Sequence, residues 1–197
     1  MKIRGFLYLL GLMVVMLAVG LACGSSAPEP TAEPEPVATE APVAGNELTT
    51  FTDQNNFLAV DLPGDWAYAQ DVDSENNNWY WDVFTSPDER AMIESVVFDD
   101  GTAWTGSSSG KQALYMLHEF YSSTGEEGDI RISDDSIQKD GSERLVWTSK
   151  GGGYSGISFF EVRGTTTFLM FTVRYDNDAE DEYLDTLNEV ISSYRIP

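Results

Sequence analysis

Cysteine, histidine and basic residues are scarce in this chain. Its 197 residues include one cysteine, one histidine and 11 Lys or Arg against 33 Asp or Glu. A single cysteine excludes an intramolecular disulfide, and a single histidine excludes a zinc site built from several histidines. Because clustered Lys and Arg bind phosphate backbones, the net charge of -22 argues against nucleic acid as a partner.

The shortage of histidine also limits the available catalytic chemistry. Ser-His or Cys-His catalysis could rest only on His118, at the edge of the apolar face of an expected helix. Gly151, Gly152 and Gly153 lack the Lys-Ser/Thr that follows the glycines of a phosphate-binding loop. Carboxylates are too numerous to single out an acid and base pair. We therefore expect no catalytic residues and no enzyme activity, with hydrolysis as the alternative.

An apolar run near the N-terminus ends at the only cysteine. Lys2 and Arg4 precede residues 6–21, which are almost wholly apolar, and Cys23 follows. The run is shorter than the roughly 20 residues that a transmembrane helix needs. A basic start and a small residue before the cleavage point are typical of a secretory signal peptide. The segment predicts a signal peptide over residues 1–22.

The residues up to this cysteine resemble the lipobox of bacterial lipoproteins. Ala22 and Cys23 match the pattern, whereas Gly20 holds the position that usually carries Leu, Val or Ile, and Leu21 follows it. The resemblance implies lipidation of Cys23 by acyl chains such as palmitate, and a lipid anchor on the extracytoplasmic side of the cell membrane. An uncleaved signal anchor and ordinary secretion are the alternatives. Both would also place the rest of the chain outside the cytoplasm.

A linker and one domain are expected after the signal peptide. Residues 23–47 begin with the lipidated cysteine and are rich in Pro and Glu, which favours an extended polyproline II stalk. Residues 48–197 contain all five tryptophans and are long enough for a single α+β domain with one core. The acidity of the mature chain favours solubility or a saline or acidic habitat, with a surface for divalent cations as the alternative.

Strand patterns dominate the domain, and two segments have helical periodicity. Helices are expected over residues 111–122 and 179–194, the second with Asp178 as its N-cap. Residues 168–171 are apolar without alternation, which predicts a sheet centre covered on both faces. Two helices and a largely antiparallel sheet indicate an α+β fold. Strands are expected over residues 57–62, 66–72, 79–85, 91–98, 130–137, 143–150, 154–163 and 165–175.

The order of these elements resembles that of PsbP/Mog1-like domains. The matching segments are residues 57–66, 84–87, 162–164 with the strand that follows, and 191–196. The resemblance covers most of residues 50–197 and implies an α/β/α sandwich around an antiparallel sheet. Members of the family include extrinsic photosystem subunits, a small-GTPase-binding protein and many exported proteins of unknown role. The resemblance therefore implies no single function and no functional residue.

Three tryptophans are candidates for ligand binding. Trp79 and Trp81 share one face of an expected strand, and Trp104 lies near a Gly/Ser-rich loop. Exposed tryptophans stack on sugar rings or anchor protein partners. The alternative is that Trp79 and Trp81, together with Trp147, belong to the core.

Asp71, Asp73, Glu75 and Asp82 are the candidate metal ligands. Oxygen ligands at alternate positions, with an acid at the twelfth, resemble an EF-hand calcium loop. Asn76 stands where glycine is usual, and the following residues predict a strand rather than a helix. Calcium binding is therefore an alternative to an ordinary polar connection between strands, and no other cofactor is expected.

These features together predict a membrane-anchored extracytoplasmic lipoprotein with a non-enzymatic binding or accessory domain. One alternative is a carbohydrate- or cell-wall-binding module that uses the exposed tryptophans. Another is a calcium-dependent accessory domain. We expect the membrane to be contacted through the lipid anchor, and a protein or a glycan to be the partner of the domain.

Overall fold

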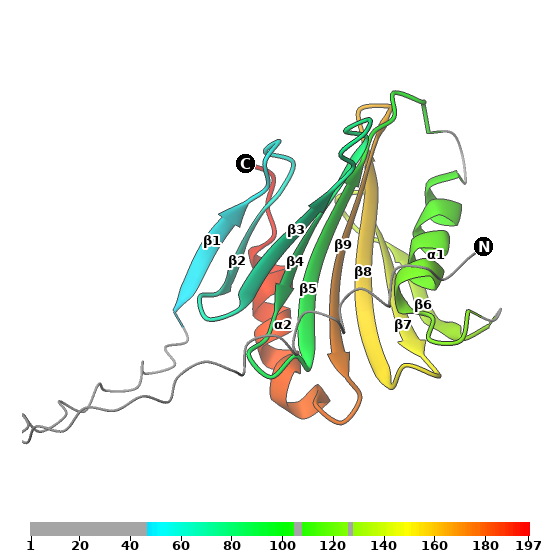
Figure 1. The fold of residues 1–197 in the computed structure, drawn as a ribbon. Coiled ribbons are helices and arrows are strands. Elements are labelled where there is room, and N and C mark those ends of the chain that lie inside the picture. The colour runs from blue at the N-terminus through cyan, green and yellow to red at the C-terminus, as the bar shows by residue number, and fades with distance from the viewer. Residues whose placement is uncertain (1–46, 105–107, 126–127) are drawn as a thin grey trace, which may run out of the picture. The chain divides into compact units, whose positions relative to one another are not determined.

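The computed structural model describes residues 47–104, 108–125 and 128–197 (Figure 1). The predicted signal peptide, Cys23 and nearly all of the predicted linker lie outside these residues. Within them, no helix is long and apolar enough to cross a membrane. The elements in chain order are β1 (Leu48–Thr52), β2 (Ala59–Pro63), β3 (Ala67–Val72), β4 (Trp79–Thr85), β5 (Ala91–Phe98), α1 (Ser108–Tyr121), β6 (Ile130–Ile137), β7 (Glu143–Ser149), β8 (Tyr154–Arg163), β9 (Thr167–Asp176) and α2 (Glu180–Ser193).

Seven strands form one antiparallel sheet in the order β3-β4-β5-β9-β8-β7-β6. The last strand in the sequence, β9, therefore lies at the centre and joins the meander β3–β5 to the meander β6–β8 (Figure 1). Strands β1 and β2 form a separate antiparallel hairpin. This arrangement confirms the predicted α+β fold with two main helices and a largely antiparallel sheet.

The central strand β9 is buried on both of its faces. Leu169 and Phe171 contribute to a core cluster that includes α2 and β2. Phe168 and Met170, which alternate with them, contribute to a second cluster that includes α1. Because successive side chains of a strand point to opposite faces, helices on both sides of the sheet explain the continuous apolar run. The prediction from residues 168–171 is confirmed.

The two faces of the sheet are covered to different extents. On the face that we call the α2 face, α2 and β2 pack over the core residues of β4, β5 and β9. On the opposite face, the α1 face, helix α1 packs against β8 and β6 (Figure 1). Among the described residues, α1 meets strand β4 only through side chains, with Phe120 stacked on Trp81.

Some local predictions were wrong. Strand β1 was not expected, and helix α1 begins at Ser108, before the predicted start at residue 111. Ala179, not Asp178, is the N-cap of α2, and it makes no side-chain capping bond. Asp178 instead pairs with Arg90, whose guanidinium is 2.7 Å from its carboxylate. Three acidic residues in the first turn of α2 still complement the positive end of the helix dipole.

Candidate functional site

Strand β4 presents its two tryptophans on the α1 face. Trp79 and Trp81 are half-buried there, whereas Tyr80 between them is buried in the cluster beneath β2 and α2. The register pairs Trp81 with Asp71 of β3 and with Val96 of β5. These three side chains therefore form a row across three strands on one face of the sheet.

Helix α1 supplies the opposite side of this row. Gln112, Tyr115, Met116, Glu119 and Phe120 are spaced by three or four positions, so they form one stripe along the helix. This stripe and the strand residues enclose a groove of about 300 Å³, which we call the aromatic groove. Its lining residues are Asp71, Trp79, Trp81, Val96, Phe98, Gln112, Tyr115, Met116, Glu119 and Phe120.

Aromatic rings dominate the aromatic groove. Trp81 and Phe120 are stacked, with ring centroids 4.9 Å apart and planes inclined by 12°. Val96 and Met116 are buried, whereas Phe120 and Tyr115 keep 41% and 58% of their surface exposed. Aromatic side chains this exposed on neighbouring elements form an apolar patch of the kind that binding sites use.

Trp104 lies behind the groove and does not line it. Its indole nitrogen donates to the backbone oxygen of Thr166 at 2.7 Å. Its ring packs against Phe98, which lines the groove, with centroids 6.0 Å apart, and against Phe168 of the core. The structure thus brings Trp79 and Trp81 together in one groove and gives Trp104 a supporting position.

The sequence pattern did not reveal the contribution of α1. Leu114 and Phe120 are apolar residues of this helix, yet both are exposed. The buried residues of α1 are Ala113, Met116, Leu117 and Tyr121, a narrower stripe than the apolar residues suggest. The apolar residues of α1 cover more of the helix than packing on the sheet alone requires. This excess is the signal that could have shown that α1 also contributes to the groove.

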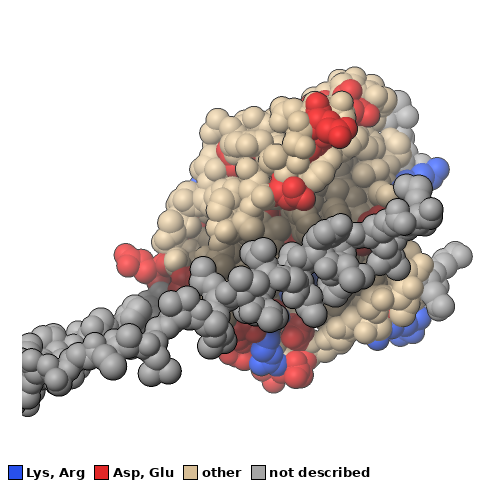
Figure 2. Space-filling view, viewed as in Figure 1, with Lys and Arg blue, Asp and Glu red and all other residues tan. Residues whose placement is uncertain are grey.

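The charged side chains that line the groove are both acidic. Asp71 lies on the strand side, Glu119 lies on the helix side, and both are exposed. None of the ion pairs among the described residues includes either of them. Other carboxylates lie at several separate places on the face seen in Figure 2. The groove therefore combines aromatic rings with uncompensated negative charge.

A buried carboxylate lies on the same face, two positions before Val96. Glu94 of β5 is 3% exposed. Tyr121 at the end of α1 donates its hydroxyl to Glu94 at 2.5 Å. Burial raises the pKa of Glu94, although the bond from Tyr121 and the charge of Arg174 oppose this rise. The bond fixes the end of α1 to the sheet and so holds one side of the groove in place.

The four predicted metal ligands do not share one site. Asp71 lines the aromatic groove on the α1 face. Asp82 points to the α2 face, where it is fully buried and accepts hydrogen bonds from Tyr68 and Gln70, both at 2.8 Å. Because Asp82 pairs with Gln70, the neighbouring Asp71 necessarily points the other way. Among the described residues, no group of three His, Cys, Asp or Glu side chains is placed to hold a metal ion.

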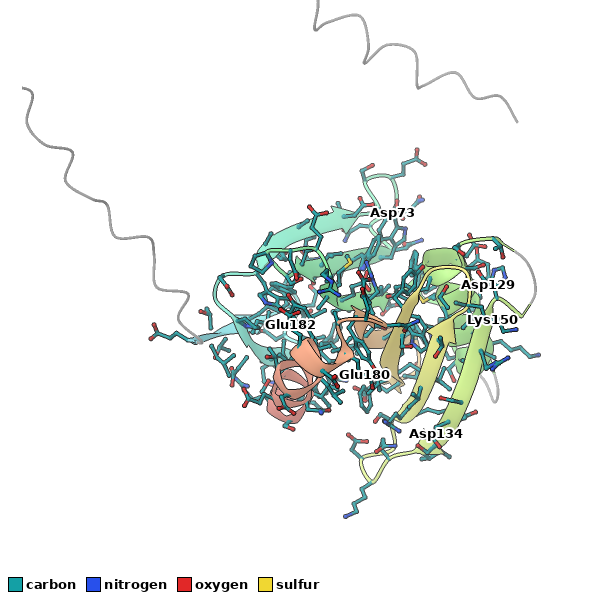
Figure 3. All side chains as sticks on the ribbon, turned by 90° about the horizontal axis from the view of Figure 1, so that it is seen from below. Asp73, Asp129, Asp134, Lys150, Glu180 and Glu182 are labelled. Carbon is teal, nitrogen blue, oxygen red and sulfur yellow. The ribbon has the colours of Figure 1, made fainter. Side chains whose placement is uncertain are left out.

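Asp73 organises the turn between β3 and β4 (Figure 3). Its carboxylate accepts the backbone N–H groups of Glu75, Asn76 and Asn78, and these bonds lower its pKa. Asn77, rather than Asn76, adopts the left-handed conformation, with φ of 57°. The arrangement is a polar turn in which backbone amides occupy the oxygen atoms of Asp73.

Asp129 is a structurally important acid that the sequence did not single out. It accepts hydrogen bonds from Ser122, Ser123, Thr124 and Gly151 at 2.8–3.2 Å. Burial alone would raise the pKa of Asp129, but these bonds outweigh it and lower the pKa to about 2. The residue therefore ties the end of α1 to the turn between β7 and β8 (Figure 3).

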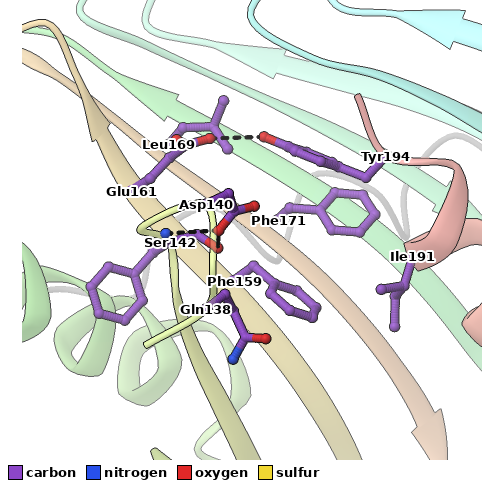
Figure 4. A pocket seen from close by; sticks show the side chains of 10 residues that line it. Gln138, Asp140, Ser142, Phe159, Glu161, Leu169, Phe171, Ile191 and Tyr194 are labelled. Atoms are coloured by element: carbon purple, nitrogen blue, oxygen red, sulfur yellow. Dashed lines mark hydrogen bonds between the residues drawn. The ribbon is translucent and has the colours of Figure 1, made fainter. Parts of the chain in front are cut away.

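A second cavity lies between β8, β9, the turn after β6 and the end of α2 (Figure 4). It measures about 180 Å³ and has apolar walls that include Phe159, Phe171 and Ile191. Its acidic groups already have partners: Glu161 accepts from Tyr194 at 3.0 Å, and Asp140 accepts from Ser142 at 2.8 Å. Because the acidic groups of this cavity already accept hydrogen bonds from neighbouring side chains, the aromatic groove is the better candidate for binding a ligand.

Comparisons with known proteins support the fold. No protein-family model and no curated protein matches the chain. The structure is similar to the solution structure of cyanobacterial PsbP (CyanoP) from Synechocystis sp. PCC 6803, with a TM-score of 0.56 and 14% identity over 82% of this chain and 99% of that chain. A crystal structure of a protein from Bacteroides thetaiotaomicron matches with a TM-score of 0.40 and 14% identity over 75% of this chain and 48% of that chain. The likeness to CyanoP shows that the chain has a PsbP-like fold.

Proposed function

We propose that the protein is an extracytoplasmic accessory domain, anchored through lipidated Cys23, that binds a ligand in the aromatic groove without converting it. The observation that carries this proposal is the groove itself, where half-buried tryptophans of β4 and exposed aromatic rings of α1 line one space. The protein's two buried core clusters and its PsbP-like fold are compatible with an accessory role. The anchor rests on the sequence pattern around Cys23.

The lining of the groove favours binding over catalysis. The described residues that line the groove include no serine, threonine, cysteine, histidine or lysine, so its nucleophilic side chains are its carboxylates and the hydroxyl of Tyr115. The carboxylates of Asp71 and Glu119 would be the pair for the alternative hydrolytic function. Loss of a hydrolytic activity in Asp71→Asn, with ligand binding retained, would contradict the non-enzymatic assignment.

The binding role is tested by the fluorescence of the full chain during titration with soluble cell-wall glycan fragments and with small organic ligands. We expect a saturable change with at least one of them, and loss of that change in Trp79→Ala. Trp66→Ala is the matched control, because Trp66 is a half-buried tryptophan that packs on Tyr183 away from the groove. Binding that persists in Trp79→Ala would contradict the proposed site.

The anchor is tested separately by labelling cells with radioactive palmitate. We expect the label on the wild-type protein and in the membrane fraction. Cys23→Ser should lose the label and release the protein from the membrane fraction. An unlabelled wild-type protein that still sediments with membranes would instead support the uncleaved signal anchor.

A glycan-binding module is the second candidate function. The observation that favours it is the presence of hydrogen-bonding groups on Asp71, Gln112 and Glu119 beside the tryptophans. Sugar rings stack their apolar faces on aromatic side chains while their hydroxyls bond to such groups. Saturable binding of neutral wall fragments that depends on Trp79 would favour this candidate.

A further inference from the structure

We infer that the aromatic groove selects a cation, and that its ligand carries a quaternary or methylated ammonium group. This inference rests on the proposed ligand-binding function of the groove and specifies its chemistry. It follows from the aromatic walls, from the sign of the charges that line them, and from the small number of other polar groups present.

The walls provide ring faces for a cation. Trp79 and Trp81 come from β4, Phe98 from β5, and Tyr115 and Phe120 from α1. Because Trp81 and Phe120 stack on each other, each of these two rings keeps at most one face for a ligand. The face of an aromatic ring is electron-rich, and tryptophan attracts cations most strongly. Methyl groups on an ammonium spread its charge and pack against rings without requiring hydrogen-bond acceptors. Such a ligand suits a groove whose floor, at Val96 and Met116, is apolar.

The carboxylates that line the groove complement the charge of a cationic ligand. Asp71 and Glu119 lie on opposite sides of the groove, and no described ion pair neutralises either of them. A neutral ligand would partly desolvate these carboxylates without compensation, whereas a cation would compensate both. The net charge of -22 also attracts cations to the surface of the protein. Among the described lining residues, the neutral hydrogen-bonding groups are the amide of Gln112, the hydroxyl of Tyr115 and the indole N–H groups of Trp79 and Trp81, and none of them carries a charge that could replace the pairing of a cation with the carboxylates.

Choline and its neutral tert-butyl isostere, in which carbon replaces the charged nitrogen, test the inference. The full chain is kept in a polyoxyethylene detergent, so that no choline or sugar headgroup competes, and binding is followed by tryptophan fluorescence and calorimetry. We expect choline to bind about tenfold more tightly than the isostere. Raising the salt from about 0.05 M to 0.5 M should weaken the binding of choline and leave that of the isostere unchanged.

Three variants locate the site, and two further variants are controls. Asp71→Asn and Glu119→Gln should each weaken choline binding several-fold without changing the isostere, and Trp79→Ala should weaken both ligands. Asp71 and Glu119 are exposed, so we expect their variants to keep the wild-type circular dichroism and melting temperature. Trp66→Ala and Glu189→Gln are the controls, because these residues line a different acidic pocket beside α2. Neither control should change choline binding.

The outcomes separate the inference from the proposed function. Equal affinity for choline and the isostere, or undiminished choline binding in an Asp71→Asn, Glu119→Gln double variant, would overturn the inference and leave a binding groove. Binding of neutral glycans that depends on Trp79, together with no binding of choline, would also overturn the inference and leave a binding groove. Loss of choline binding in Trp66→Ala but not in Trp79→Ala would overturn the assignment of the site to the aromatic groove and would place it in the pocket beside α2. Absence of binding by choline, the isostere and glycans alike would overturn both proposals.

Discussion

The side chains of strand β4 are buried to different extents on the two faces of the sheet. On the α2 face, Tyr80, Asp82 and Phe84 of β4 are at most 8% exposed, under β2 and α2. On the α1 face, Trp79 and Trp81 remain half-buried at the edge of the area that α1 covers. The α2 face, which we also call the closed face, buries even a carboxylate. The α1 face at β4, which we call the open face, leaves two tryptophans in contact with solvent. The difference teaches that β4 is fully packed on the α2 face and only partly covered on the α1 face, where its tryptophans are accessible to a ligand.

The largest expected difference between the faces is in stability. Phe171→Ala removes a fully buried ring from the α2 face and should lower the free energy of unfolding by about 3–5 kcal/mol. Trp79→Ala removes a half-exposed ring from the groove and should cost only about 1 kcal/mol. Urea denaturation followed by circular dichroism measures both. Similar costs at the two positions would show that Trp79 is packed as tightly as a core residue, which would contradict its place in an accessible groove.

The support of α1 beside the open face should depend on the ionisation of Asp129. Its hydrogen bonds lower its pKa to about 2 from an ordinary value of 3.8, so its stabilising contribution is complete above about pH 4 and is lost as the pH falls toward 2. Asp129→Asn should therefore lower the melting temperature at pH 7 and have little effect near pH 2. Calorimetric scans at the two pH values measure this, and a deficit independent of pH would argue against the ionised form as the cause.

The closed face should show the opposite pH dependence at Asp82. Burial raises the pKa of this carboxyl above its ordinary value of 3.8, so the folded protein binds the proton more tightly than the unfolded chain. Wild-type stability should then fall as the pH rises above about 4. Asp82→Asn removes this titration and should be more stable than wild type at pH 7, with no advantage near pH 4. A constant difference across this range would contradict the assignment.

Calcium should have the smallest effect. Asp71 and Asp82 point to opposite faces, and the oxygen atoms of Asp73 already accept backbone amides. We therefore expect the same melting temperature, within about 1 °C, in excess calcium and in a chelator. A clear rise with calcium would revive the calcium-dependent alternative and would point to a rearranged turn after β3.

The alternation and the apolar runs predicted most of the sheet, because local pattern and tertiary position agree there. Strands β4 and β5 have the predicted bounds, and the apolar run in β9 correctly indicated cover on both faces. Strand β1 was missed because its residues are mostly exposed and show no alternation of burial. Asp178 failed as an N-cap because Arg90, distant in sequence, binds its carboxylate.

The site was predictable only on its strand side. The period of a strand places Trp79 and Trp81 on one face from the sequence alone. The position of α1 over β6 and β8 depends on packing between segments far apart in the chain, and this position decides that Tyr115 and Phe120 stay exposed. The opposite orientations of Asp71 and Asp82 follow from the register of β3 with β4, which the calcium-loop pattern ignores.

The position of β9 has a consequence for how the chain folds. Each meander, β3–β5 and β6–β8, can pair locally, but the two can join only when β9 enters between β5 and β8. Ala91 must then find Tyr175, so a long loop has to close before this contact forms. If the chain is exported unfolded from its N-terminus, β9 emerges after the other strands of the sheet and completes it. A truncation before β9 should therefore leave two unjoined half-sheets with exposed edges, which are prone to aggregate.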